Sequence, residues 1–231
     1  MKFNIKSHIY LSTVFLACSV LCASAQLEDA VNITFRCISL DSPIRVNLYT
    51  QLEGGEPIRI YANSRTNWIK YSGPNPIVFY RDSNPTGEQN VRVPVGQFAF
   101  SKGMDTPLLL FTQSEVKGHY RITSIDDDLE VAPAGSYRIF NFTQKDIAGI
   151  VGSQRFRATP GDSALVRNAE DEAVEVSVRL AENAEDGPER LYAATWTYSP
   201  DFRYLIFIVP TGDRTRGNIK IRKITDIVAE S

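Results

Sequence analysis

Histidine and cysteine are scarce in this chain. Of its two histidines and three cysteines, one of each lies beyond the first 25 residues, namely His119 and Cys37. Zinc sites built from Cys and His ligands need several such residues at fixed spacing, and Ser-His-Asp or Cys-His triads need a histidine base. The composition therefore argues against both enzyme classes. A single cysteine also excludes an internal disulfide once the first 25 residues are removed.

Long apolar runs are lacking as well. The apolar stretch Ile9–Cys22 is shorter than the ~20 residues that a membrane-spanning helix needs. Lys2 and Lys6 precede it and small residues follow it up to Ala25, which is the layout of a secretory signal. We therefore expect a signal peptide at residues 1–25, cleavage after Ala25, a periplasmic or extracellular protein and no transmembrane span. Lipidation at Cys18 remains an alternative.

The chain has no excess of positive charge and no EF-hand calcium loop. Without the two lysines of the leader, 23 basic residues face 27 acidic ones, a net charge of minus 4 that argues against nucleic-acid binding. The acidic residues cluster at 126–128, 170–172 and 185–186, in polar segments that we interpret as solvated turns. Weak calcium binding and two-carboxylate hydrolysis remain alternatives for these clusters. We predict no metal site and no cofactor.

Two stretches of the sequence recur at nearly the same spacing. The segment after Gly118 matches the segment after Gly217 at an offset of 99 residues, and this pairs Asp127 with Asp226. The segment from Phe35 resembles the one from Tyr137 at an offset of 102. These offsets predict a duplicated unit of domain size. We place the boundary near residue 128, which gives domains at 26–128 and 129–231.

Short alternating runs rich in β-branched and aromatic residues, separated by turn residues, fill both units. This pattern predicts an all-β protein of two tandem antiparallel β-sandwich domains of the immunoglobulin-like kind. Residues 163–184 also fit helical spacing, although the alternation in "VEVSVRL" favours a strand. The expected strands are 31–40, 44–51, 57–62, 66–71, 76–81, 90–100, 107–113 and 118–125 in the first unit, and 136–142, 147–151, 154–158, 163–167, 173–180, 190–198, 203–210 and 217–224 in the second.

His119 and Cys37 both have ordinary structural interpretations. His119 aligns with Asn218 of the repeat, directly after a glycine, where a polar residue suits a turn that enters a strand. Cys37 alternates with polar residues on an apolar strand face, which predicts a buried thiol. We therefore assign no catalytic residue and expect that the protein is not an enzyme.

Aromatic side chains are the best candidates for binding. Trp196 and Tyr198 share a strand face with Tyr192, and Trp68 lies close to Tyr61 in the sequence. Flat aromatic rows can stack on sugar rings, so Trp68, Trp196 and Tyr198 are the candidate binding residues. A tryptophan inside a sandwich strand is nevertheless more often a core residue, where its large surface stabilises the fold, and this is the interpretation that we favour for these rings.

Basic residues crowd the end of the chain. Arg214, Arg216, Lys220, Arg222 and Lys223 follow one another within ten positions. We expect this strand to face the acidic segment 170–186 across a sheet, and the alternative is an exposed docking edge.

Residues 135–166, "GSYRIFNFTQKDIAGIVGSQRFRATPGDSALV", combine an R-x-x-N-x-[ST] strand, a return strand ending in Gly152 and a turn at Pro160-Gly161. This stretch resembles the AlgF-type periplasmic β-sandwich accessory proteins of alginate O-acetylation and secreted sandwich domains of unknown function. The resemblance implies an exported, non-catalytic accessory protein of two sandwiches. It assigns no functional residue.

The sequence thus predicts an exported, non-catalytic binding or scaffolding protein of the cell envelope, whose partner is an envelope protein or a polysaccharide. An accessory protein that binds polysaccharide or assists exopolysaccharide modification is the first alternative. A carboxylate-dependent hydrolase is the second.

We predict that residues 129–231 fold without residues 26–128, because about 100 residues suffice for a sandwich domain with its own core. Expressed alone, this fragment should give dispersed amide resonances and a cooperative melt. A fragment that folds only when the N-terminal half is added would show that the two units share their sheets.

Overall fold

The computed structural model describes residues 30–84, 91–104, 106–168, 170–184, 187–211 and 218–228, and in these residues the chain is built of β-strands without a helix. The expected all-β class is therefore confirmed. Within these ranges, accordingly, no helix has the length and apolarity to cross a membrane.

The first unit contains two facing sheets, one of strand order β3-β1-β6-β7 and one of order β2-β4-β5. Phe35, Phe79 and Phe111 pack between the two sheets with T-shaped ring contacts, at the centre of the first core. The strands are β1 Val31–Ser39, β2 Leu48–Tyr49, β3 Ile69–Gly73, β4 Ile77–Asp82, β5 Arg92–Phe98, β6 Pro107–Gln113 and β7 Tyr120–Asp126.

The second unit also contains two facing sheets, of order β11-β8-β14-β15 and β10-β9-β12-β13. Its core includes Tyr137, Trp196, Tyr198 and Tyr204, and the Tyr137 and Tyr204 rings stack with their centroids 4.5 Å apart. The strands are β8 Ser136–Asn141, β9 Ile147–Val151, β10 Gln154–Ala158, β11 Ser163–Arg167, β12 Val174–Ala184, β13 Gly187–Tyr198, β14 Phe202–Pro210 and β15 Ile219–Ile227.

The expected strands agree with the observed ones except between residues 44 and 71. There, strand pairing is confined to the two-residue β2, the isolated bridge of Ile58 with Leu48, and β3. Residues 163–184 form β11 and β12, so the helical alternative is not realised.

The sheets are not purely antiparallel, which corrects the expectation from sequence. β1 pairs with β6 in parallel, and β8 pairs with β14 in parallel. The alternating pattern could not reveal this, because strand direction depends on where the chain crosses between the sheets. The sheets β3-β1-β6-β7 and β11-β8-β14-β15 have equivalent strand orders. The repeat-related Arg36 and Arg138 lie opposite Leu108 and Leu205, respectively, in equivalent register.

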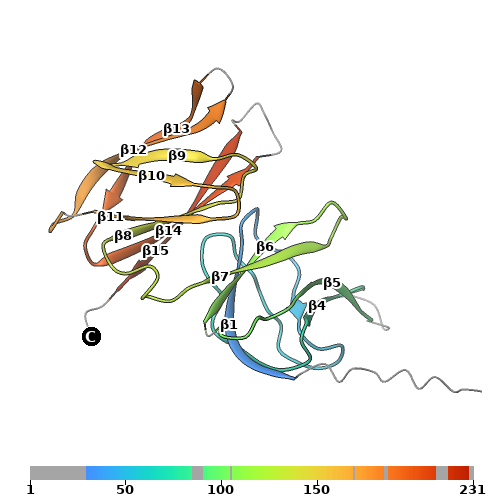
Figure 1. Cartoon of the computed structure of the whole chain (residues 1–231). Coiled ribbons are helices and arrows are strands. Elements are labelled where there is room, and N and C mark those ends of the chain that lie inside the picture. The colour runs from blue at the N-terminus through green and yellow to red at the C-terminus, as the bar shows by residue number, and fades with distance from the viewer. Residues whose placement is uncertain are drawn as a thin grey trace, which may run out of the picture.

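A third apolar cluster lies between the two units, which adjoin along their four-stranded sheets (Figure 1). Residues of β6 point alternately to the two sides, so that Leu109 and Phe111 enter the first core whereas Leu108 and Leu110 face the second unit. The members of this third cluster are Ile38, Leu40, Leu108, Leu110, Ala132, Phe140, Leu205, Phe207, Val209 and Ile224. Both faces of β6 and β14 are therefore buried, unlike those of a sheet with one wet face.

This shared cluster couples the two units by apolar contact. A fragment of residues 129–231 keeps its own core but exposes Phe140, Leu205, Phe207 and Val209, which are buried in the whole chain. We therefore expect the isolated fragment to be less stable than the same unit within the chain.

Candidate binding site

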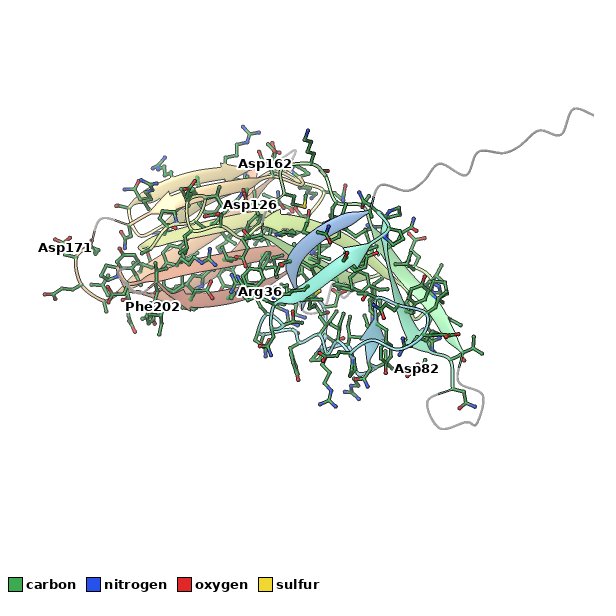
Figure 2. All side chains as sticks on the ribbon, turned by 90° about the horizontal axis from the view of Figure 1, so that it is seen from below. Arg36, Asp82, Asp126, Asp162, Asp171 and Phe202 are labelled. Carbon is green, nitrogen blue, oxygen red and sulfur yellow. The ribbon has the colours of Figure 1, made fainter. Side chains whose placement is uncertain are left out.

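A buried ion cluster joins the two units at Asp127. Its carboxylate lies 2.6 Å from Arg36 Nη2, 2.7 Å from Arg65 Nε and 3.1 Å from Arg203 Nη2. The first two arginines belong to the first unit, and Arg203 begins β14 of the second. Figure 2 shows Arg36 where the two units meet.

The repeat partner of Asp127 completes the cluster. Asp226 accepts hydrogen bonds from Arg65 Nη1 at 2.6 Å and from Arg203 Nε at 2.8 Å. Two arginines therefore each bridge two carboxylates, and Arg65 reaches from the first unit to the end of β15. Charge-assisted hydrogen bonds of this kind are among the stronger polar contacts in proteins.

The cluster corrects the interpretation of Asp127 as part of a solvated turn, whereas Asp126 beside it is exposed as expected. Asp127 is 5% exposed, because the neighbouring unit covers it. Asp171 projects from the far end of the second unit (Figure 2), and Glu170 and Glu172 beside it are exposed as expected. Residues 185–186 lie outside the described residues. Within the described ranges, no group of His, Cys, Asp and Glu side chains has the arrangement of a metal site.

The basic strand β15 also belongs to the interface. It neither faces the acidic segment 170–186 nor forms an exposed docking edge, which were the two roles that the sequence suggested. Lys220 Nζ donates to the carbonyl oxygen of Asp41 at 2.9 Å, and Arg222 donates to the carbonyl oxygens of Leu40 and Asp41. These side chains cap the end of β1 in the first unit. Arg214 and Arg216 lie outside the described residues.

We predict that Asp127→Asn destabilises the whole chain by about 3–5 kcal/mol, because the substitution leaves buried guanidinium groups without their counter-charge. Urea denaturation measures this change. Asp171→Asn is the matched control and should change the free energy of unfolding by about 0.5 kcal/mol or less, since its side chain is exposed. Equal stability of the two variants would mean that the ion cluster contributes nothing to the joint.

Two of the three candidate aromatic residues lie in the core. Trp196 is 7% exposed and Tyr198 is 1% exposed, and both pack on Tyr137. The aromatic row expected on this strand is therefore not available for stacking on a ligand. An alternating strand puts aromatics on one face but does not say which face is covered.

Trp68, the third candidate, lies in an open groove on the first unit. Trp68 and Tyr61 are each 49% exposed, and both line this groove, whose volume is about 680 Å³. The Arg36 guanidinium lies over the Trp68 ring at 4.2 Å from its centroid. The ion cluster thus holds one wall of the groove in place through Arg36.

Backbone hydrogen bonds fix the segment that forms one side of the groove against the first core. Ile58 exchanges backbone hydrogen bonds with Leu48, and Ser39 donates its N–H to the carbonyl oxygen of Tyr61. Ile58 and Ile60 therefore point inward, whereas the alternate residues Arg59 and Tyr61 face outward. The alternation in "PIRIY" was the sequence signal that could have identified Arg59 beside Tyr61.

The lining of the groove is basic. Arg59, Arg65 and Lys70 contribute positive charge and Glu56 contributes one negative charge. Arg59 and Lys70 are exposed, and neither forms a salt bridge within the part of the chain that the structure describes. Both side chains are therefore accessible to form an ion pair with a ligand.

A larger hollow of about 950 Å³ lies beside β1 and β3, with Asn32, Lys70 and Lys102 at its rim. Its aromatic rings, Tyr71 and Phe100, are buried in the first core. This hollow lacks an exposed ring for stacking, so the groove at Trp68 is the better binding site.

His119 and Cys37 occupy structural positions. His119 follows Gly118 in the turn before β7, and its backbone closes that turn through hydrogen bonds with Ser114 and Val116. Cys37 is fully buried as a free thiol, and burial raises its pKa well above the ordinary value. The thiol is therefore unreactive, which confirms the interpretation of Cys37 as a core residue.

Comparison of the chain with protein-family models and with curated proteins gave no match. The site is therefore interpreted from its own geometry.

We predict that the two tryptophans are separable by fluorescence. With Trp196→Phe, the remaining Trp68 should emit at long wavelength and be quenched readily by acrylamide, because half of its surface is exposed. With Trp68→Phe, the remaining Trp196 should emit at shorter wavelength and resist quenching. Equal quenching of the two variants would contradict the placement of Trp196 in the core.

Proposed function

We propose that this chain is an exported, non-catalytic binding protein of the cell envelope, built of two tandem immunoglobulin-like sandwiches. The observation that carries the proposal is the groove in which Tyr61 and Trp68 are half exposed. Large aromatic side chains are usually buried, and their exposure in a concave site favours a binding role.

The joint between the units supports a scaffold with fixed geometry. The apolar cluster and the ion cluster at Asp127 both cross the joint. Arg36 and Arg65 connect the joint to the groove wall, so the groove is held in shape before a ligand arrives. Such preorganisation lowers the entropy that binding costs.

Polysaccharide is favoured over protein as the ligand. The rings of Tyr61 and Trp68 offer flat faces for sugar rings, and the polar side chains of Thr50, Gln51 and Asn67 also line the groove and suit sugar hydroxyl groups. An accessory role beside an exopolysaccharide machine fits this chemistry.

A carboxylate-dependent hydrolase is the weaker alternative. Asp127 and Asp226 share the partners Arg65 and Arg203 at the joint. A glycosidase needs one carboxylic acid that is protonated and faces a cleft. Both carboxylates accept hydrogen bonds from guanidinium groups, which favours their charged form and not the protonated acid that this role requires.

A pull-down with immobilised protein tests the proposal. Envelope and culture-medium fractions of the source cells are passed over the protein, and the retained components are compared. We expect wild-type protein to retain a component that the double variant Tyr61→Ala/Trp68→Ala loses, because the variant removes both exposed rings. The double variant Val116→Ala/Leu165→Ala removes comparably exposed apolar side chains elsewhere and should retain that component. Retention by all three proteins, or by none, would contradict a binding role for the groove.

A further inference from the structure

We propose that the groove binds an acidic polysaccharide, one whose sugar rings carry carboxylate groups. This inference rests on the proposed function and names the chemical class of its ligand. Cationic side chains lie beside the two exposed rings, and a neutral glycan would not need them.

Positive charge surrounds both rings. Arg59 lies two residues before Tyr61 on the same outward face, and Lys70 lies two residues after Trp68. Glu56 is the one acidic side chain among the described residues that line the groove, against Arg59 and Lys70, because the charge of Arg65 is compensated by Asp127 and Asp226. A neutral sugar would leave Arg59 and Lys70 without a partner, whereas carboxylates on alternate sides of a chain would pair with them.

The other cations of the region have different roles. Arg65 uses Nε, Nη1 and Nη2 to bind Asp127 and Asp226, and Arg36 binds Asp127 while lying over Trp68. These two arginines are structural, so the pair that contacts an acidic ligand is Arg59 and Lys70. Both are exposed, and their contribution should therefore weaken with salt.

The remaining features favour a saccharide over other anionic polymers. Nucleic acid carries a phosphate charge on every nucleotide and is bound by clusters of basic residues, whereas this groove offers the two cations Arg59 and Lys70. An acidic peptide would meet the cations without needing two aromatic faces. Carboxylate-bearing pyranose rings use the cations and the rings together.

The test compares oligogalacturonate with its fully methyl-esterified form, which has the same sugar rings without the charge. Calorimetry or biolayer interferometry on the full chain should show tighter binding of the acidic form, and this preference should decrease as salt is raised. Poly-L-glutamate is the probe for an acidic polymer without sugar rings, and we expect it to bind more weakly than oligogalacturonate.

The double variant Arg59→Gln/Lys70→Gln should bind oligogalacturonate roughly tenfold more weakly and bind the methyl ester as the wild type does. Arg155→Gln/Arg167→Gln removes the same charge from exposed positions of the second unit and should bind as the wild type does. Trp68→Ala should weaken binding of both forms, with an unchanged melting curve as the check on folding.

The outcomes separate the two proposals. Equal binding of both forms, with loss in Trp68→Ala, would overturn the acidic ligand and leave a glycan-binding groove. Binding of poly-L-glutamate as tight as that of oligogalacturonate, unaffected by Trp68→Ala, would overturn the saccharide. Binding of neither form would overturn the inference, and retention of an envelope component that depends on Tyr61 and Trp68 would then leave the proposed function standing.

Discussion

The buried carboxylate of Asp127 is the contact on which the arrangement of this molecule depends. It gathers Arg36, Arg65 and Arg203, and through Arg65 and Arg203 it is linked to Asp226 at the other end of the repeat. A buried charge of this kind is costly unless it is fully paired, so its pairing selects one relative placement of the two units. The apolar cluster around it supplies the larger favourable term, because burial of apolar surface is the dominant stabilising effect in folding.

The same contact shapes the candidate site. Arg36, a member of the cluster, also lies over the Trp68 ring. Arg65 lines the groove and also binds Asp226 in the second unit. The second unit therefore contributes to the groove without touching a ligand, by fixing the side chains behind its wall. The placement of the second unit is therefore coupled to the shape of the groove on the first.

The elements that local pattern controls were predictable. Strands β6, β9, β10 and β11 have the expected bounds, and the match of Asp127 with Asp226 anticipated their equivalent positions in the two units. The site was predicted less well, since Trp196 and Tyr198 are core residues and Arg59 and Lys70 were missed. Period-two alternation identifies two faces of a strand but not which of them a second sheet covers, and residues 44–71 pair too irregularly to give a strong pattern.

The sequence by itself determined the all-β class, the positions of most strands and the scarcity of histidine and cysteine, because these depend on residue type and on spacing along the chain. The tertiary structure alone decided the parallel pairing of β1 with β6 and of β8 with β14, the burial of Asp127 and the exposure of Trp68. Each of these depends on which surfaces meet after the chain has crossed between its sheets. A carboxylate in an acidic turn is solvated until arginines from both units cover it, and that covering is held by contacts such as that of Arg65 with Asp226, 161 positions apart.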